Sequence, residues 1–523
     1  MFSALTHLVR LGRAGFVLAR EGVFALVDPA MVPFPARVGL RIARLIERPS
    51  SADAEHRLAT ALTKLGPSYV KLGQFLATRP DVVGIALAHD LESLQDKMEP
   101  FGQSQAVAQV EVALGKPIDE LFTSFGPPVA AASIAQVHRA EAADKDGTRA
   151  VAVKVLRPDI ARRFRVDLDA FAFAARQAES FSADARRLRL MEVVATLARS
   201  VAVEMDMRLE AAALSEMAEN IKADPDFRVP GVDWDRTAKD VLTLEWIDGT
   251  PLSDRAKLEQ KGFDLPQLGR AVIQTFLRHA LRDGFFHADM HPGNLFIDDD
   301  GRLVAVDFGI MGRLRPKERR FLAEILYGFI TRNYLRTAEV HFEAGYVPAQ
   351  HSVEDFAQAI RAIGEPIHNR TAEDISMAKL LMLLFEVTGL FDMRTRPELL
   401  LLQKTMVVVE GVARGLDPKL DMWKVSEPVV REWIERHLGP VGKLEDIAEG
   451  AGEVGKFLGG MPALMSRGAA MVEQLDTITR DGLVLSPETV EAIGAAESRR
   501  NRWIVVALWV IAALLAWGVW KMI

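Results

Sequence analysis

The chain has 523 residues, of which 49% are hydrophobic and 26% are charged, and its formal net charge is −7. At about 100–200 residues per domain, this length has room for several domains and a sizeable buried core. The chain contains no cysteine, which excludes disulfides, iron–sulfur clusters and cysteine nucleophiles. Its mildly acidic balance argues against general nucleic-acid binding, because that activity depends on a dense basic surface.

The first fifty residues are basic, with seven arginines against three acidic residues. Arg10, Arg13 and Arg20 fall on one side of a helix when residues are placed about 100° apart. A membrane-surface helix, a cleaved mitochondrial transit peptide and an ordinary solvated helix all fit this pattern. From about 50 to 125, apolar residues recur at helical spacing, and we expect a helical extension over 1–125.

The middle of the chain mixes strands and helices. Short β-rich runs lie at 129–139, 150–156, 240–246, 295–297 and 303–306. Helical periodicity covers 165–220, 265–284 and almost all of 315–437. The pattern predicts an α+β, helix-rich protein with a mixed lobe over 126–248 and a more helical lobe over 249–438.

A glycine-rich linker with helical pieces is expected over 439–502. It contains a G-x-G-x-x-G pattern at Gly450, Gly452 and Gly455. Because this pattern follows a polar, helix-like segment instead of a strand, we interpret it as linker and not as a dinucleotide site.

The C-terminal segment from Trp503 to Trp520 carries no charged residue. Its 18 residues span roughly 27 Å as a helix, close to the hydrocarbon thickness of a bilayer. Three arginines precede the segment and Lys521 follows it, which predicts one transmembrane helix with the bulk of the chain on the cytoplasmic side. Ala512 and Ala516 form a small-xxx-small pair that favours pairing of two copies, hence a homodimer. A buried core helix is the competing interpretation.

The strongest chemical signal is His287-Ala-Asp289-Met-His291-Pro-Gly-Asn294, followed thirteen positions after Asn294 by Asp307-Phe-Gly. Two apolar runs and an Asp-rich turn between them predict a hairpin that brings Asn294 and Asp307 together at its open end. One carboxylate and one amide oxygen suit Mg²⁺, and Asp289 can face the same site as a base or orienting group. This is the arrangement of a kinase catalytic loop and metal-binding loop.

A transition-metal site formed by His287, Asp289, His291 and Asp307, as a hydroxylase would need, competes with the kinase interpretation. A metal site of this kind does not explain the Pro-Gly-Asn run or the Phe-Gly pair, so the kinase interpretation is favoured.

A kinase also needs a phosphate-pairing lysine on a strand, and Val-Ala-Val-Lys154-Val supplies it. The alternating valines face the core while Lys154 points into the cleft. Its partner should be a carboxylate on a following helix, among Glu204, Asp206 and Glu210; we favour Glu210. The sequence Leu-Thr-Leu-Glu245-Trp looks like a strand that enters an interlobe hinge, where the backbone can contact adenine.

No glycine-rich phosphate loop precedes Lys154. In its place stands an alanine-rich segment formed by Ala130, Ala131, Ala132 and Ser133. Alanine Cβ atoms hinder the close backbone approach that glycine permits, so the phosphates of a nucleotide must be held differently here.

Taken together, these residues resemble the UbiB family, also called the ABC1 atypical kinases, from about residue 30 to the end. The segment Leu65-Gly-Pro-Ser-Tyr-Val-Lys71-Leu-Gly-Gln74 matches the K-x-G-Q signature of that family. Arg79-Pro-Asp and Leu94-Gln-Asp follow it, and the alanine-rich segment is also specific to the family. The H-x-D-x-H-P-x-N loop is shared with aminoglycoside and choline kinases.

The resemblance implies a protein-kinase-like two-lobed fold that binds ATP and Mg²⁺. It implies a gate in which the helix bearing Lys71 and Gln74 packs over the active site, held with the help of Glu204 and Asp206. It also implies a weak ATPase stimulated by membrane lipid and a role in ubiquinone biosynthesis. In the site, Lys154 with Glu210 would bind phosphates.

The partners implied are membrane lipid, prenylphenol or quinone precursors and other ubiquinone-biosynthesis proteins, with no nucleic acid. We expect a bacterial inner membrane location, with the mitochondrial inner membrane as the alternative. Two other functions stay open: a small-molecule or lipid phosphotransferase, and a nucleotide-switched scaffold of a lipid-biosynthetic complex. Direct hydroxylation has no support in the residues.

Overall fold

The computed structural model describes residues 2–26, 41, 44–47, 57–77, 83, 87, 90–91, 94, 98–144, 147–181, 183–367, 387, 389–393 and 397–439. The chain divides into two compact units, Met1–Glu435 and Arg436–Ile523, and the fold below is that of the first. The predicted spanning helix at 503–520, the G-x-G-x-x-G pattern and nearly all of the predicted linker lie outside the described residues. Within the described ranges, no helix is long and apolar enough to cross a membrane.

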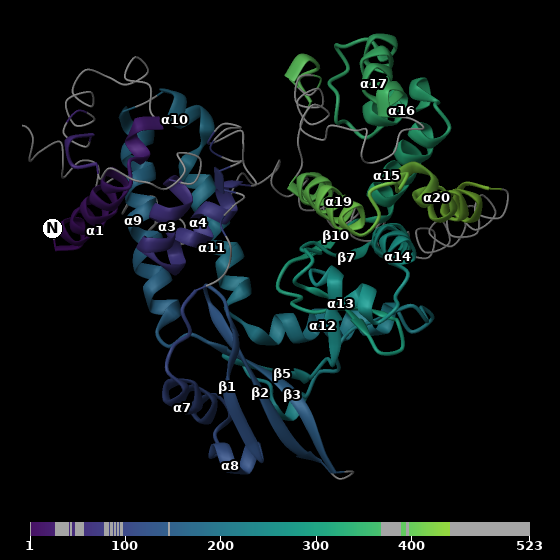
Figure 1. The fold of residues 1–523 in the computed structure, drawn as a ribbon. Helices are drawn as coiled ribbons and strands as arrows, with labels where there is room; N and C mark the ends of the chain where they lie inside the picture. The colour runs from purple at the N-terminus through teal and green to yellow at the C-terminus, as the bar shows by residue number, and fades with distance from the viewer. Residues whose placement is uncertain are drawn as a thin grey trace, which may run out of the picture. The chain divides into compact units, whose positions relative to one another are not determined.

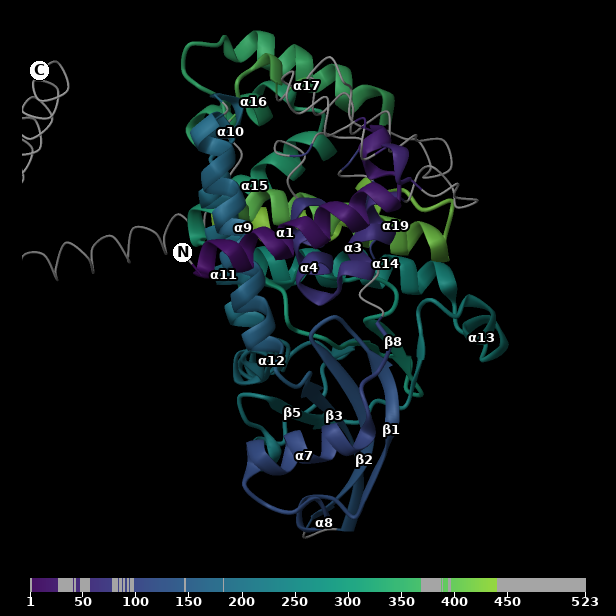
Figure 2. The same ribbon diagram turned by 90° about the vertical axis from the view of Figure 1, so that its left-hand side faces the viewer.

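The described residues of the N-terminal extension are mainly helical. Its elements are α1 (Phe2–Arg20), the 3-10 turn η1 (Val23–Leu26), α3 (Arg57–Leu65) and α4 (Pro67–Ala77). Figure 2 shows α1 beside α3 and α9, and these helices are in contact. Leucines from α3 and from positions 91 and 94 pack together under α4. Gly66, with φ +105°, separates α3 from α4, a backbone conformation that a side chain would strain.

A four-stranded antiparallel sheet in the order β1-β2-β3-β5 forms the first lobe (Figure 1). Its strands are β1 (Ser124–Ala131), β2 (Ala135–Asp144), β3 (Gly147–Leu156) and β5 (Val241–Glu245). The alternating valines of β3 are fully buried against Val110 of α7 (Gln103–Leu114), next to which lies α8 (Ile118–Leu121). Lys154 lies between two of these valines and therefore points to the other face.

The predicted continuous strand at 129–139 is wrong, because β1 and β2 are separated by a turn at 132–134. The Ala132 N–H donates to the Ala135 carbonyl across this turn. Arg157, more than twenty residues away in the sequence, donates to the Ala132 carbonyl and fixes the turn from outside.

Four helices connect β3 to β5. They are α9 (Ile160–Phe181), α10 (Ala183–Leu188), α11 (Leu190–Glu204) and α12 (Met207–Asn220). The prediction that Glu204, Asp206 and Glu210 share one helix is wrong. The chain breaks at 205–206, where Asp206 becomes the N-cap of α12 and its carboxylate accepts from the Arg208 N–H.

Short strands and turns in the second lobe surround residues 287–294, called the catalytic segment below because the sequence predicts this role for them. One sheet has the order β4-β9-β8-β6 and a second pairs β10 with β7. The strands are β4 (Phe227–Arg228), β6 (Gly249–Pro251), β7 (Phe285–His287), β8 (Leu295–Asp298), β9 (Leu303–Ala305) and β10 (Met311–Arg313). A 3-10 turn, η4 (Trp234–Arg236), lies next to β5. The predicted hairpin is confirmed, since β8 and β9 are antiparallel and pair Leu295 with Ala305.

In the described residues, helices complete the lobe, in agreement with the helical periodicity found there. They are α13 (Arg255–Gln260), α14 (Leu265–Arg278) with its π-helical turn η5 (His279–Asp283), α15 (Pro316–Ile330), α16 (Tyr334–Glu343), α17 (Val353–Ile367), α19 (Pro397–Leu416) and α20 (Met422–Leu438). Helix α19 packs closely along α14, where a Cβ on Gly269 would lie 3.1 Å from the Ala413 carbonyl oxygen. Thr405 of α19 donates to the Ala288 carbonyl at 3.1 Å and so contacts the catalytic segment.

Candidate functional site

Lys154 is the centre of an ion-pair cluster between the lobes. Its Nζ lies 3.0 Å from both carboxylate oxygens of Glu210 and 2.9 Å from Oδ1 of Asp307. Burial disfavours the charged ammonium, but the attraction of Asp307 and Glu210 outweighs this cost and raises the pKa of Lys154. The lysine therefore stays charged and joins strand β3, helix α12 and the segment after β9.

Glu210 is the carboxylate on α12 that the sequence favoured as the partner of Lys154. Burial raises the pKa of its carboxyl, while Lys154 and a hydrogen bond from the Phe308 backbone oppose that rise. Only 7% of the residue is exposed. Because it contacts both Lys154 and Phe308, Glu210 ties the position of α12 to the Asp307-Phe308-Gly309 segment.

Asp307 has φ +63°, in the left-handed region where residues with a side chain are uncommon. Its side chain is about half exposed, at 49%, and so is accessible to solvent. The charge of Lys154 holds the pKa of this carboxyl well below its usual range. A strained backbone that presents an ionised carboxylate to solvent is typical of a functional site.

His287 organises the catalytic segment. Its Nε2 donates to the Val306 carbonyl at 3.0 Å, and its Nδ1 accepts from the Asp289 N–H at 3.0 Å. Burial lowers the pKa of the ring, so His287 is a neutral bridge between the residue before Asp307 and the loop of Asp289. Sequence reasoning gave it no such role.

These two hydrogen bonds also weigh against the transition-metal alternative, because both ring nitrogens of His287 are occupied by backbone groups. Over the described ranges, no group of three histidine, aspartate or glutamate side chains is arranged to hold a metal ion.

Asn294 and Asp289 lie together at the open end of the β8–β9 hairpin. The Asn294 side-chain amide donates to the Asp289 carbonyl at 3.1 Å and faces the Asp289 carboxylate at 3.4 Å. The Val306 N–H donates to the Asn294 carbonyl at 2.9 Å. This bond holds the two strands together at the residue that directly precedes Asp307. With its nitrogen so engaged, Asn294 keeps its side-chain oxygen as an acceptor. An amide oxygen on Asn294 and a carboxylate on Asp307, two residues joined by the β8–β9 hairpin, are the ligand types that fit a hard divalent cation such as Mg²⁺.

Lys71 of α4, one of the residues predicted to form a gate, contacts α11. Lys71 pairs with Glu204 at 2.5 Å, and both side chains are nearly buried, at 12% and 11% exposure. The charge of Lys71 also contributes to the lowered pKa of Asp307, so α4 reaches toward the site. Gln74 lies one turn further along α4 and is half-buried. Asp206 pairs with Arg208 at 2.7 Å and caps α12, a contact within its own helix.

The alanine-rich segment is pinned by its backbone. The Met98 N–H donates to the Ala131 carbonyl, and the Arg157 guanidinium donates to the carbonyls of Ala132 and Glu99 at 2.8 and 2.9 Å. Ala130 is exposed at the end of β1, whereas Ser133 is fully buried. Sequence reasoning missed Arg157; it comes directly after β3, and a basic residue there was the available signal.

Glu245 ends β5 at the predicted hinge. Its carboxylate pairs with Arg228 at 2.9 Å and accepts from the Gly231 N–H at 3.2 Å. Its own N–H donates to the Gly231 carbonyl at 2.8 Å. These contacts turn the Glu245 side chain toward the β4 region.

Comparison with known proteins also identifies a kinase-like family. The family model of the ABC1 atypical kinase-like domain matches residues 93–341, and that of the UbiB helical domain matches residues 360–421. The chain is 38% identical to a probable protein kinase UbiB of Marinobacter nauticus over 450 residues, or 85% of this chain and 82% of the relative.

A solved structure also resembles the chain, that of Rv3197 from Mycobacterium tuberculosis in complex with erythromycin. The TM-score is 0.52 at 26% sequence identity, and the match covers 76% of this chain and 98% of the other. The lysine between two carboxylates, the kinase-like catalytic segment, both family models and the extended identity lead to one conclusion. The chain belongs to the UbiB family of ABC1 atypical kinase-like proteins.

Proposed function

We propose that this protein is an ATP-dependent atypical kinase or ATPase that supports ubiquinone biosynthesis. The observation that carries the proposal is the cluster of Lys154, Glu210 and Asp307, in which a charged lysine pairs with a buried carboxylate and with a half-exposed, ionised one. The kinase-like family and the name of the Marinobacter relative support the ubiquinone connection.

ATP with Mg²⁺ would supply the transferable phosphoryl group and a cation that neutralises its charge. Lys154, positioned by Glu210, would hold phosphate oxygens, and Asn294 with Asp307 would hold the cation. Asp289 would accept a proton from, or orient, the attacking hydroxyl or water. Its place is fixed by His287 through the Asp289 N–H.

Alanine Cβ atoms at 130–132 and the buried Ser133 leave the phosphates less backbone contact than a glycine loop would. Phosphate binding would therefore depend more heavily on Lys154 than in kinases with a glycine-rich loop. Lys71 and Gln74 of α4 would limit access to this site, with Glu204 as the anchor of Lys71.

The setting of this activity is also part of the proposal. The uncharged run at 503–520 would anchor the protein in a bacterial inner membrane, where prenylphenol or quinone precursors reside. Membrane lipid, those precursors and other proteins of ubiquinone biosynthesis would be its partners.

The test is an ATPase and phosphotransfer assay with radiolabelled ATP on the full-length chain and on Asp307→Asn. Loss of a metal ligand should reduce turnover by at least about a hundredfold, as removal of one well-placed electrostatic group does in other enzymes. Asp299→Asn, an exposed aspartate of the β8–β9 turn, is the matched control and should keep full activity. Equal turnover in Asp307→Asn and the control would exclude this site as the catalytic one.

A further inference from the structure

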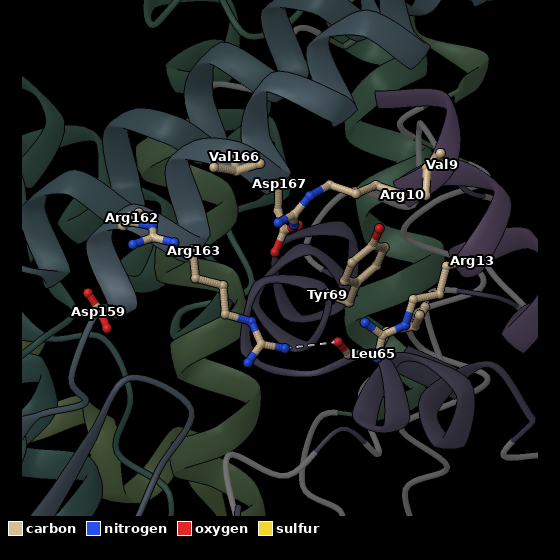
Figure 3. A pocket seen from close by; sticks show the side chains of 10 residues that line it. All are labelled: Val9, Arg10, Arg13, Leu65, Tyr69, Asp159, Arg162, Arg163, Val166 and Asp167. Carbon is tan, nitrogen blue, oxygen red and sulfur yellow. Dashed lines mark hydrogen bonds and ion pairs between the residues drawn. The ribbon is translucent and has the colours of Figure 1, made fainter. Parts of the chain in front are cut away.

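A cavity of about 620 Å³ lies between α1, the α3–α4 junction and the start of α9 (Figure 3). None of its lining residues belongs to the candidate active site. Its volume is in the range of small-molecule sites in proteins, which runs from about 300 to 1,000 Å³.

The lining is rich in arginine. Its charged members are Arg10, Arg13, Arg162, Arg163, Asp159 and Asp167. Positive charges exceed negative ones by two, although the chain as a whole is acidic. The cavity therefore favours an anion.

The arginines differ in what they already bind. Arg10 pairs with Asp167, and Arg163 donates to the Leu65 carbonyl at 3.2 Å. In the described part of the chain, Arg13 and Arg162 make no hydrogen bond or ion pair and are exposed to solvent. Figure 3 shows Arg13 and Arg163 reaching toward the Leu65 carbonyl from opposite sides. The guanidinium groups of Arg13 and Arg163 together carry more N–H donors than the protein offers acceptors at this place.

Apolar surface completes the lining. Val9, Leu65 and Val166 contribute aliphatic groups. The Tyr69 ring, held edge-on by Phe171 with ring centroids 5.0 Å apart, lies between Arg10 and Arg13 in Figure 3. A bare inorganic anion would leave this surface unused, so the fitting ligand has an organic body as well as a charge.

We propose that this cavity binds an organic phosphate, with the phosphoryl group between Arg13 and Arg163 and the organic part against Tyr69 and Val166. Guanidinium groups match phosphate oxygens in pairs, which makes arginine the residue best suited to this task. The inference concerns a second site and does not depend on the proposed activity.

The site is coupled by contact to the helix that carries Lys71. The Arg163 guanidinium occupies the space that a Cβ on Gly66 would need, and α4 begins at the next residue, Pro67. A ligand that engages Arg163 would act on this junction. Binding should therefore slow amide hydrogen exchange at the start of α4.

The test is calorimetric titration of the full-length chain with three probes: inorganic phosphate, glycerol 3-phosphate and dihexanoyl phosphatidic acid below its micelle concentration. Arg13→Gln/Arg163→Gln should weaken binding of an organic phosphate at least about tenfold, because two charge-assisted contacts are lost. Arg13→Gln alone, which changes an exposed side chain without a partner, should weaken binding several-fold while the fold stays intact. The control Arg165→Gln/Arg176→Gln removes the same charge from exposed positions of α9 outside the cavity and should bind as the unchanged chain does.

The probes also distinguish the source of the ligand. Equal binding of glycerol 3-phosphate and dihexanoyl phosphatidic acid would identify a soluble phosphate ester, whereas clear preference for the latter would identify a lipid headgroup. The proposal is wrong if only inorganic phosphate binds, if no probe binds, or if the control pair weakens binding as much as the cavity pair.

Discussion

Two residues show how burial and charge are balanced in this protein, and Lys154 is the first. It lies in the interior with both oxygens of Glu210 within 3.0 Å, and Glu210 itself is only 7% exposed. A buried carboxylate is tolerated because the lysine neutralises it; alone it would be strongly unfavourable. The stability of this region and the chemistry of the site thus depend on the same contact.

Replacement Lys154→Met should lower the free energy of unfolding by about 3–5 kcal/mol, since it leaves Glu210 buried without its cation. The second change Glu210→Leu, added to the first, should restore much of that loss because the orphaned charge is removed. Urea unfolding of the three proteins measures both effects. A double variant no more stable than Lys154→Met would contradict the ion-pair explanation.

His138 of β2 is the second residue of this kind. Its Nδ1 donates to the Gly126 carbonyl and its Nε2 accepts from the Gln136 amide, each at 2.8 Å. Burial lowers its pKa, although the bond to Gly126 opposes this. Protonation of Nε2 would place its N–H against the N–H of the Gln136 amide, so the folded state disfavours the protonated ring.

Because the pKa of His138 is lower in the folded state, the unfolded chain takes up the proton first. Its contribution to stability is therefore complete at neutral pH and is lost as pH falls below about 6.5, the ordinary histidine value. We expect the drop in unfolding free energy between about pH 7 and pH 5.5 to be smaller in His138→Gln. Parallel pH profiles for the variant and the unchanged chain would show that His138 is not responsible.

At the scale of elements, helix α4 depends on a glycine for its position. A Cβ on Gly73 would clash with Leu94 and lie 2.6 Å from Leu62 Cδ1, in a cluster of leucines with less than 10% exposure. Side chains of this kind have little space to move, so the glycine permits the close approach of α4 to α3.

Gly73→Val should destabilise this extension by about 1–3 kcal/mol, the usual cost of overpacking a core. Gly12→Ala in α1 is the matched control, because nothing lies within 4 Å of its Cβ position. It should instead stabilise the helix by about 0.5–1 kcal/mol. Thermal unfolding followed by circular dichroism distinguishes the two, and an equal shift for both variants would show that packing at Gly73 is unimportant.

Local pattern was sufficient to predict most elements. Alternating valines identified β3, and helical periodicity identified α3, α4, α14 and the helices after 315. The two breaks that pattern missed have different causes. The turn at 132–134 depends on Arg157, a contact distant in sequence, whereas the break at 205–206 depends on local capping by Asp206. Only the break at 205–206 could have been predicted from neighbouring residues.

At the scale of the molecule, ion pairs connect the N-terminal extension to the helices between β3 and β5, and the pair between α4 and α11 is the more deeply buried one. Lys71 of α4 and Glu204 of α11 are both nearly buried, so their pairing is little screened by solvent. Lys64 and Glu21 also pair within the extension, at 2.8 Å, but the lysine there is 53% exposed.

Either Lys71→Met or Glu204→Gln should therefore speed amide exchange in both α4 and α11, and the double variant should add little to the single changes. Lys64→Met should leave exchange in these helices almost unchanged, because exposed pairs contribute about 0–1 kcal/mol. Additive effects of the two single changes would mean that the residues act independently.

The parts of the candidate site that lie close together in the sequence could be predicted. Asn294 and Asp307 could be brought together in advance, because a hairpin connects them. Lys154 and Glu210 could be named as candidates but not paired from the sequence alone, since three helices, α9 to α11, lie between Lys154 and the helix that carries Glu210. The bridging role of His287 depends on the carbonyl of Val306, and a backbone acceptor has no signature in the sequence.

The bond from Thr405 to the Ala288 carbonyl joins the part of the chain that matches the helical-domain model to the peptide beside Asp289. The two family models thus describe regions that share a buried hydrogen bond, and they are not separable modules. A protein cut after residue 341 would leave that carbonyl without its donor and uncover the face of α14 that packs on α19. A chimaera that takes its catalytic segment from a relative should accordingly fold only when its α19 comes from the same relative.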